Sequence, residues 1–292
     1  MDLSDKKILV TGCTGLLGSN LVKVLSKKNN VVGISNEATI KDILYHSKKL
    51  DIRNKIEVIK IITDFSPNVV IHTAGLTNLD YCENNKKEAW EVNVEGTRNL
   101  VLASREIEAK LIYVSTDYVF DGKRGMYKEE EAPNPLNYYS LTKYEGEQII
   151  KELPDHLICR TSVLYGNHPR ANFVVWVIRE LKQEKRINVV NDQFNSPTLA
   201  DDLTDMIIEL LKKDETGIFH TAGGERINRL DFTKKITEIF DLDFSLVDPI
   251  SSDKLNWVAK RPMDSSLDVS KVSKIKRPLN IEEGLTRMRG SQ

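Results

Sequence analysis

The chain has 292 residues, with 42 basic and 43 acidic side chains and a formal net charge of −1. This balance gives no electrostatic basis for binding nucleic acid or a membrane surface. No apolar run approaches the about 18 residues that a membrane-spanning helix needs, and the first six residues lack the charge pattern of a signal peptide. We therefore expect a cytoplasmic protein, built as one compound domain or two closely joined ones.

The first predicted element is a short apolar strand, Lys7–Val10, followed by a glycine-rich turn and a helix. The turn reads Thr-Gly-Cys-Thr-Gly-Leu-Leu-Gly over Thr11–Gly18, and apolar residues at helical spacing follow over Leu16–Lys28. Glycines let a backbone turn tightly and approach a pyrophosphate, which then binds at the helix amino terminus. The spacing Gly-x-x-Gly-x-x-Gly differs from the usual Gly-x-Gly-x-x-Gly fingerprint. The flanking strand and helix nevertheless favour a dinucleotide site over a plain strand–helix connection.

The second predicted strand, Val31–Ile34, bears on the choice of cofactor. An acidic residue at its end would bind the adenosine ribose hydroxyls and repel a 2′-phosphate. The chain has Ser35 and Asn36 there, and Lys41, Lys48 and Lys49 lie a little downstream. This pattern favours NADPH, but the lysines also fit a solvent-exposed helix face, so NADH remains an alternative.

Further apolar runs alternate with helical patterns along the first half of the chain. The predicted strands are Val69–Ile71, Leu111–Val114 and Leu157–Cys159, and the predicted helices are near Arg53–Phe65, Lys86–Arg105 and Tyr139–Leu153. Strands that are apolar on both faces belong to a parallel sheet covered on each side. The alternation predicts a doubly wound, Rossmann-like α/β fold, which binds ligands at the carboxyl ends of its strands.

The regular alternation of apolar strands and helices becomes less clear after Gly166. We expect residues 1–165 to form an NAD(P)-binding domain, and residues 166–292 to form mainly a smaller mixed α/β substrate-binding region with some segments packed back on the first domain. The predicted elements of this part are helices Phe173–Glu184, Asp201–Lys213 and Leu230–Phe240, strands Asn188–Val190 and Ile218–Thr221, and an exposed basic segment Lys271–Arg277.

Cysteines and histidines give no sign of a metal site. Cys13, Cys82 and Cys159 are far apart and lack metal-ligand spacing. His72 and His220 lie within strand-like runs, so we expect both to pack in the core.

Tyr139 and Lys143 form a Tyr-x-x-x-Lys pair at the start of a predicted helix. Residues four apart share one helix face. An ammonium beside a phenol would lower the phenol's pKa from about 10, and an acid useful near neutral pH would need about 3–4 kcal/mol of such stabilisation. The pair predicts a proton-donating site, although either residue could equally lie on an ordinary helix surface.

The order of motifs resembles the extended short-chain dehydrogenase/reductase family, and in particular the dTDP-4-dehydrorhamnose reductases. Ser-Thr-Asp-Tyr-Val-Phe-x-Gly and Pro-x-Asn-x-Tyr-x-x-x-Lys are typical of that subfamily. The matching stretches are Gly12–Gly18, Ser115–Gly122, Tyr127–Glu131, Pro135–Lys143 with Gly146 and Glu147 behind it, Arg160–Gly166, Asn172 and Phe173, Asp192–Thr198 and Arg261–Leu267.

The resemblance implies reduction of the 4-keto group of a nucleotide-linked deoxysugar, most directly dTDP-4-dehydro-L-rhamnose to dTDP-L-rhamnose, in a protein that could form a homodimer. Thr116 would bind the substrate carbonyl oxygen, Tyr139 would protonate it, and Lys143 would hold the nicotinamide ribose. Cofactor contacts are implied for Gly12, Thr14, Gly15, Leu16, Leu17, Ser35, Asp51, Ile52, Ala74, Gly75, Leu76 and Thr77, in addition to Tyr139 and Lys143. Substrate contacts are implied for Asp117, Glu129, Val163, Asn172, Gln193 and Arg261, although Arg261 could instead only brace a loop.

Two alternatives stay open beside the reductase. Many members of the subfamily carry Trp where this chain has Val163, which leaves the sugar undefined. A dehydratase would place Glu at the position of Tyr118, so dehydration is disfavoured, whereas a sugar-nucleotide epimerase is harder to exclude. A non-catalytic, NADP-binding regulatory subunit like the β subunit of methionine adenosyltransferase shares many of these motifs.

Overall fold

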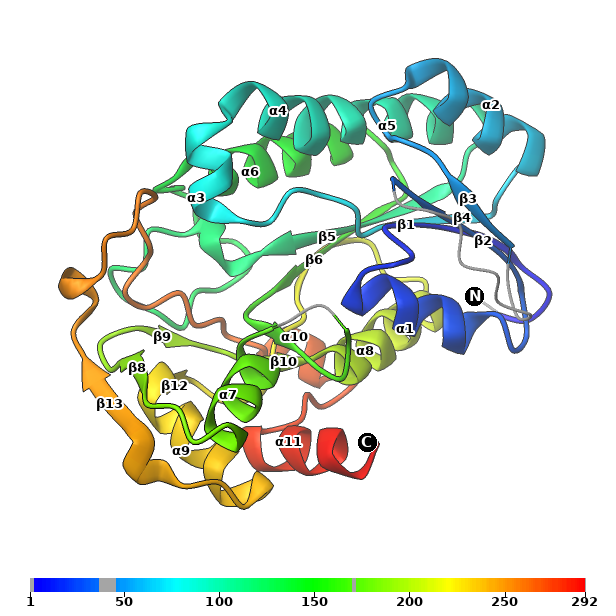
Figure 1. Cartoon of the computed structure of the whole chain (residues 1–292). Coiled ribbons are helices and arrows are strands. Elements are labelled where there is room, and N and C mark those ends of the chain that lie inside the picture. Colours follow the sequence, from blue (N-terminus) through cyan, green and yellow to red (C-terminus); the bar gives the residue numbers. More distant parts are fainter. Residues whose placement is uncertain (1–2, 37–45, 170–171, 292) are drawn as a thin grey trace.

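A seven-stranded parallel sheet forms the centre of the computed structural model, which describes residues 3–36, 46–169 and 172–291 (Figure 1). Its strand order is β11-β6-β5-β4-β1-β2-β3, and every neighbouring pair is parallel. The strands are β1 (Lys7–Thr11), β2 (Asn30–Ser35), β3 (His46–Lys49), β4 (Val69–His72), β5 (Lys110–Thr116), β6 (His156–Thr161) and β11 (Gly217–His220). The prediction of a doubly wound, Rossmann-like sheet is confirmed.

Helices cover both faces of this sheet (Figure 1). Successive side chains of a strand point to opposite faces, so Ile8 and Val10 of β1 enter one core while Leu9 enters the other. The first core lies under α1 (Leu16–Leu25) and α8 (Ala200–Lys212), and the second under α2 (Lys55–Phe65), α5 (Gly96–Glu106) and α6 (Tyr138–Ile150). His72 and His220 are buried in the sheet, as expected.

A smaller region with its own apolar core packs beside the sheet (Figure 1). Tyr165 and Phe232 are buried in this core, with their ring centres 5.5 Å apart. Its elements are α7 (Phe173–Lys182), α9 (Arg229–Phe240), α11 (Ile281–Gly290), β7 (Leu164–Tyr165), β8 (Ile187–Val190), β9 (Phe194–Asn195), β10 (Thr198–Leu199), β12 (Ile227–Asn228) and β13 (Val247–Ile250). The chain returns from this region to add β11 and α8 to the main sheet and its cover. The domain boundary at 165 and 166 stays a prediction.

Several elements differ from the sequence-based expectation. The single helix expected over 86–105 is divided into α4 (Lys86–Trp90), a π-helical turn (Glu91–Glu95) and α5. The edge strand β3 was not predicted, because its sequence His-Ser-Lys-Lys has no apolar run and it pairs through its backbone alone. The short helices α3 (Leu79–Asn84) and α10 (Ser270–Ser273) and the last helix, α11, were also not predicted.

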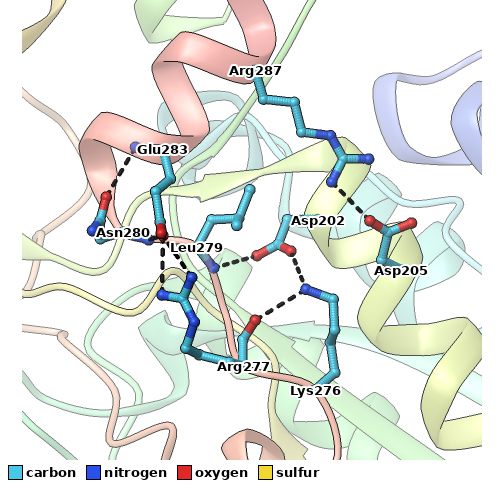
Figure 2. A network of polar contacts seen from close by, with 8 residues as sticks. All are labelled: Asp202, Asp205, Lys276, Arg277, Leu279, Asn280, Glu283 and Arg287. Atoms are coloured by element: carbon cyan, nitrogen blue, oxygen red, sulfur yellow. Dashed lines mark hydrogen bonds and ion pairs between the residues drawn. The ribbon is translucent and has the colours of Figure 1, made fainter.

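The basic segment Lys271–Arg277 is not simply exposed, which corrects the expectation. Figure 2 shows Lys276 directed at Asp202 of α8, and its Nζ atom lies 3.1 Å from a carboxylate whose side chain is only 1% exposed. The backbone N–H of Leu279 donates to the same carboxylate at 2.8 Å. A buried carboxylate needs such partners, so this segment is tied to α8 and leads directly into α11.

Candidate functional site

A cavity of about 630 Å³ lies along the carboxyl ends of the central strands. Residues that follow β1, β2, β4 and β5 line it, and so do Tyr139 and Lys143 of α6. In the sheet β1 lies between β2 and β4, where the strand order reverses, and this switch point is the usual ligand site of such folds. Every residue for which a cofactor contact was implied lines this cavity: Gly12, Thr14, Gly15, Leu16, Leu17, Ser35, Asp51, Ile52, Ala74, Gly75, Leu76, Thr77, Tyr139 and Lys143.

The glycine turn forms a cradle that larger residues would fill. Gly12 has φ +70°, and a Cβ there would lie 2.8 Å from the Thr73 hydroxyl oxygen. A Cβ on Gly18 would lie 2.1 Å from the Gly12 carbonyl oxygen, so α1 packs directly on the turn. Gly15 is the N-cap of α1 and offers no side-chain acceptor, which leaves the first backbone N–H groups for another partner. These features fit the pyrophosphate of a dinucleotide.

The end of β2 gives a further indication of the cofactor. Ser35 and Asn36 line the cavity without an acidic side chain, and Asp51 pairs with Arg53 at 2.6 Å. This guanidinium lowers the pKa of the Asp51 carboxyl. Of the lysines expected to favour NADPH, Lys48 and Lys49 are exposed and absent from the cavity wall, and Lys41 lies outside the described residues.

The loop that carries Gly75, Leu76 and Thr77 is held by Asn93, which sequence reasoning missed. The Asn93 side chain accepts from the Leu76 N–H at 2.8 Å, and its amide nitrogen donates to the Leu76 oxygen at 3.0 Å. The same nitrogen lies 3.0 Å from the Thr142 hydroxyl of α6. Asn93 is therefore a buried link between this loop and α6, and it lies in the π-helical turn, a feature frequent at functional sites.

Thr116, Tyr139 and Lys143 all line the cavity. Thr116 ends β5, whereas Tyr139 and Lys143 share a face of α6, a helix that begins where the Asn137 side chain accepts from the Ser140 N–H at 2.9 Å. The hydroxyl of Tyr139 forms a hydrogen bond with Thr116. All three candidate residues are at most 8% exposed, so a bound carbonyl group would be shielded from bulk water there.

The pKa of Tyr139 is raised, which differs from the sequence-based expectation. Burial is the main cause, the Thr116 hydrogen bond opposes it, and the Asp117 carboxylate adds to it. The Lys143 ammonium makes two other contacts: its Nζ atom donates to the Val114 oxygen at 2.8 Å and lies 3.9 Å from the Tyr113 ring centre. Burial lowers the pKa of Lys143 to about 7. In the protein alone, burial therefore outweighs any acidifying effect of the ammonium on Tyr139.

A buried ion pair joins α6 to the strand β6. Glu147 of α6 and Arg160 of β6 make two hydrogen bonds, at 2.7 and 2.9 Å, and both side chains are at most 1% exposed. The Ser115 hydroxyl donates to the same carboxylate at 2.6 Å. A Cβ on Gly146 would lie 2.3 Å from the Tyr113 hydroxyl oxygen. Gly146 and Glu147, which follow the matched stretch Pro135–Lys143, thus hold α6 against β5 and β6.

The residues implied to bind substrate divide into two groups. Asp117, Val163 and Asn172 line the cavity, and Val163 has φ 40°, an unusual conformation for a β-branched residue. Glu129, Gln193 and Arg261 do not line it. Glu129 accepts from the His220 N–H at 3.0 Å, Gln193 is buried, and Arg261 pairs with Asp80 at 3.0 Å. The interpretation of Arg261 as a loop brace agrees with this contact.

Tyr118 and Arg229 also line the cavity and were not predicted as binding residues. Arg229 begins α9, lies 4.7 Å from the Phe173 ring centre and forms a hydrogen bond with the Tyr118 side chain. Nothing in the local sequence around Arg229 marks it, because the fold brings α9 to the cavity from far along the chain.

Two further findings concern metals and membranes. Within residues 3–36, 46–169 and 172–291, no three His, Cys, Asp or Glu side chains cluster in a way that could hold a metal ion. No helix in the described part of the chain is long and apolar enough to cross a bilayer.

The chain is similar in sequence and in structure to several known proteins. The family model described as RmlD substrate binding domain matches residues 6–289. The dTDP-4-dehydrorhamnose reductase of Aggregatibacter actinomycetemcomitans is 34% identical, with 91% of this chain and 92% of that protein covered. The methionine adenosyltransferase 2 subunit beta of Bos taurus is 32% identical, with 93% and 83% covered. The crystal structure of the Bacillus anthracis dTDP-4-dehydrorhamnose reductase in complex with NADP has a TM-score of 0.91 and 33% identity, and the match covers 99% of this chain and 100% of that one.

Proposed function

The chain belongs to the dTDP-4-dehydrorhamnose reductase family, and on that premise we propose that it reduces the 4-keto group of a nucleotide-linked deoxysugar with NADPH. Reduction of dTDP-4-dehydro-L-rhamnose to dTDP-L-rhamnose is the reaction that the relatives favour. One observation carries the proposal. Thr116, Tyr139 and Lys143 line the same cavity as the glycine turn and the residues after β2 and β4.

Thr116 and Tyr139 are proposed to bind and protonate the substrate oxygen. NADPH, when bound, supplies the hydride that reduces C4. The Tyr139 hydroxyl then holds the proton that the developing alkoxide needs, and the Thr116 hydroxyl beside it fixes the oxygen's position. Fixed donors around a developing negative charge are usually the largest catalytic contribution. Because the pKa of Tyr139 is raised, this residue carries its proton throughout the neutral pH range.

Lys143 is proposed to bind the nicotinamide ribose. Its Nζ atom uses one donor on the Val114 oxygen, and an ammonium has three. The remaining donors are at the cavity wall, where ribose hydroxyls could accept them. This arrangement positions the cofactor relative to Tyr139, and holding two reactants at reactive distance supplies another large share of rate enhancement.

The regulatory alternative rests on the similarity to methionine adenosyltransferase 2 subunit beta. A regulatory subunit would bind the cofactor tightly without turnover.

Other sugar-nucleotide enzymes are the remaining alternative. Tyr118 occupies the position where a dehydratase would need a carboxylate, which disfavours dehydration. A redox-neutral conversion of the sugar nucleotide would instead indicate an epimerase.

A homodimer, a cytoplasmic location and the division at 165 and 166 are further parts of the proposal that rest on the sequence alone. Light scattering after size-exclusion chromatography tests the dimer, because a mass near twice 33.2 kDa is expected.

A spectrophotometric assay tests the reductase proposal. The purified protein is mixed with NADPH and a dTDP-4-keto-6-deoxysugar, and loss of absorbance from the reduced cofactor is followed. We expect steady turnover that falls by about 10²–10⁴-fold in Tyr139→Phe, with NADPH binding retained. Tyr138→Phe is the matched control, because Tyr138 precedes it on α6 but does not line the cavity. Equal activity of Tyr139→Phe and wild type would reject the proposal.

A further inference from the structure

A buried histidine at the end of β4 lies where two cavity-lining segments meet. His72 is 1% exposed, and its Nδ1 atom lies 2.8 Å from the hydroxyl oxygen of Thr11. Thr11 ends β1, immediately before the glycine turn. The same hydroxyl oxygen accepts hydrogen bonds from the backbone N–H groups of Thr73 and Ala74, at 3.2 and 3.1 Å. These two residues open the loop 73–77, all of which lines the cavity.

The hydrogen bonds of Thr11 determine which nitrogen of His72 carries the proton. A hydroxyl has one proton to donate and two lone pairs with which to accept. The Thr11 oxygen uses both lone pairs on the N–H groups of Thr73 and Ala74. Its proton is therefore directed at Nδ1 of His72, which must be unprotonated in order to accept it. A neutral imidazole then carries its proton on Nε2.

The protonated Nε2 atom extends these contacts to α5 and to the π-helical turn. It lies 3.0 Å from the hydroxyl oxygen of Thr97, and this hydroxyl donates to the backbone oxygen of Asn93 at 2.7 Å. The Asn93 side chain accepts from the Leu76 N–H at 2.8 Å. The loop 73–77 is thus held at two points by one ring of hydrogen bonds. The ring runs through Ala74, Thr11, His72, Thr97, Asn93 and Leu76.

The surroundings of His72 keep its imidazole neutral. Burial lowers the pKa of His72 well below its usual value, and the charge of Lys143 acts in the same direction. The ring centre of Tyr113 lies 5.4 Å away, and burial raises the pKa of this phenol, so Tyr113 adds no negative charge that would favour an imidazolium. Nδ1 of His72 therefore remains an acceptor throughout the neutral pH range.

We propose that His72 is a positioning residue for NADPH, because its unprotonated Nδ1 atom turns the Thr11 hydroxyl so that the loop 73–77 is joined to the glycine turn before the cofactor binds. The inference rests on the proposed function only for the identity of this ligand. Without the acceptor, the Thr11 proton would turn toward one of the two N–H groups and that contact would be lost. A loop that is not ordered in advance must be ordered on binding, which lowers affinity.

Replacing His72 tests this role through the affinity for NADPH, measured by isothermal titration calorimetry. His72→Phe keeps a flat ring without an acceptor, whereas in His72→Asn the amide oxygen replaces Nδ1 as an acceptor for Thr11. We expect the Kd for NADPH to rise about tenfold in His72→Phe and less than about threefold in His72→Asn. An unchanged Kd in His72→Phe, or an equal loss in both variants, would overturn the inference.

His220 provides the matched control. It is as fully buried in the sheet as His72, but its Nδ1 atom faces the backbone oxygen of Asp268 at 3.2 Å. Its Nε2 atom lies 3.4 Å from the Arg160 guanidinium. His220→Phe should therefore bind NADPH as the wild type does. A loss of affinity equal to that of His72→Phe would show that removing any buried histidine weakens binding, and would overturn the inference.

NMR reads the proton on His72 in the wild type and so does not depend on a variant that folds. Long-range 1H–15N spectra of the protein with bound NADPH distinguish a protonated ring nitrogen from an unprotonated one. We expect His72 to be protonated on Nε2 alone from about pH 6 to about pH 8. His220 should be protonated on Nδ1 instead, because a carbonyl oxygen faces that atom. A proton on Nδ1 of His72 in this range would overturn the inference.

The outcomes for the wild type separate this inference from the proposed function. A protein that binds NADPH but reduces no sugar would overturn the reductase proposal alone, because the calorimetric and NMR measurements on His72 need no turnover. A protein that binds no NADPH would overturn both. Turnover by the wild type, together with a His72→Phe variant of unchanged NADPH affinity, would overturn this inference alone.

Discussion

The Nζ atom of Lys143 donates a hydrogen bond to the backbone oxygen of Val114, 2.8 Å away, and so ties the middle of α6 to β5. Both residues line the cavity. The contact sets where the charge lies relative to Tyr139, one turn earlier on the same helix face. It makes Lys143 a fixed part of the cavity wall rather than a flexible side chain.

Replacing Lys143 tests its cofactor role. Lys143→Met should weaken NADPH binding by about tenfold or more, because it removes charge-assisted donors from the cavity. Burial lowers the pKa of Lys143 to about 7, so its protonated fraction falls as the pH rises through 7. The difference in NADPH affinity between wild type and Lys143→Met should therefore shrink from about pH 6 to about pH 8. Fluorescence titration measures both quantities. Lys151→Met, at the exposed end of α6, should bind as wild type does, and a loss there equal to that of Lys143→Met would contradict this role.

The Glu147–Arg160 pair should matter for stability. Glu147→Gln leaves the Arg160 charge buried without its counterion, and breaking such a pair costs about 3–5 kcal/mol. The exposed pair of Glu152 and Arg105 provides the control, because surface ion pairs contribute about 0–1 kcal/mol. Urea denaturation should show a large drop in the free energy of unfolding for Glu147→Gln and almost none for Glu152→Gln. Equal effects would show that burial of this pair is not what clamps α6.

Arg229 should contribute to substrate affinity. Arg229 lines the cavity, and a nucleotide sugar carries a negatively charged diphosphate. We expect Arg229→Met to raise the KM for the sugar nucleotide by about tenfold, with NADPH affinity unchanged. Arg179→Met removes an equal charge from an exposed position of α7 and should leave both constants as they are. An unchanged KM in Arg229→Met would remove Arg229 from the binding site.

The glycine turn should not tolerate a side chain at Gly18. A Cβ there would lie 2.1 Å from the Gly12 carbonyl oxygen, which is backbone and cannot move aside cheaply. Gly18→Ala should therefore lose NADPH binding by calorimetry and also lose thermal stability. Gly290 has open space around its Cβ position, so Gly290→Ala should keep both properties. Normal NADPH binding by Gly18→Ala would show that the cradle does not need this close approach.

Features encoded in short stretches of sequence were predictable. The glycine turn and the i, i+4 spacing of Tyr139 and Lys143 depend on neighbours in the chain, and the structure places both at the cavity. Asn93 and Arg229 were missed, because each acts through contacts with segments distant in sequence. Glu129 and Gln193 are motif residues but do not line the cavity, since a shared motif does not fix the place of a loop side chain.

The pKa values illustrate the same limit. Spacing alone suggested that Lys143 would acidify Tyr139. In the structure the pKa of Tyr139 is raised, because burial of the phenol dominates. The Lys143 ammonium contacts the Val114 oxygen and the Tyr113 ring. Burial is a property of the whole fold, so a local pattern cannot supply it.

The most direct measurement follows the transferred hydrogen itself. The protein is incubated with NADPH that carries deuterium at both C4 positions of the nicotinamide and with a dTDP-4-keto-6-deoxysugar, and the product is examined by NMR. We expect stoichiometric cofactor oxidation with deuterium at C4 of the sugar, and loss of that product in Tyr139→Phe. Bound but unoxidised NADPH, or a sugar converted without deuterium at C4, would show that the protein is not a reductase of this kind.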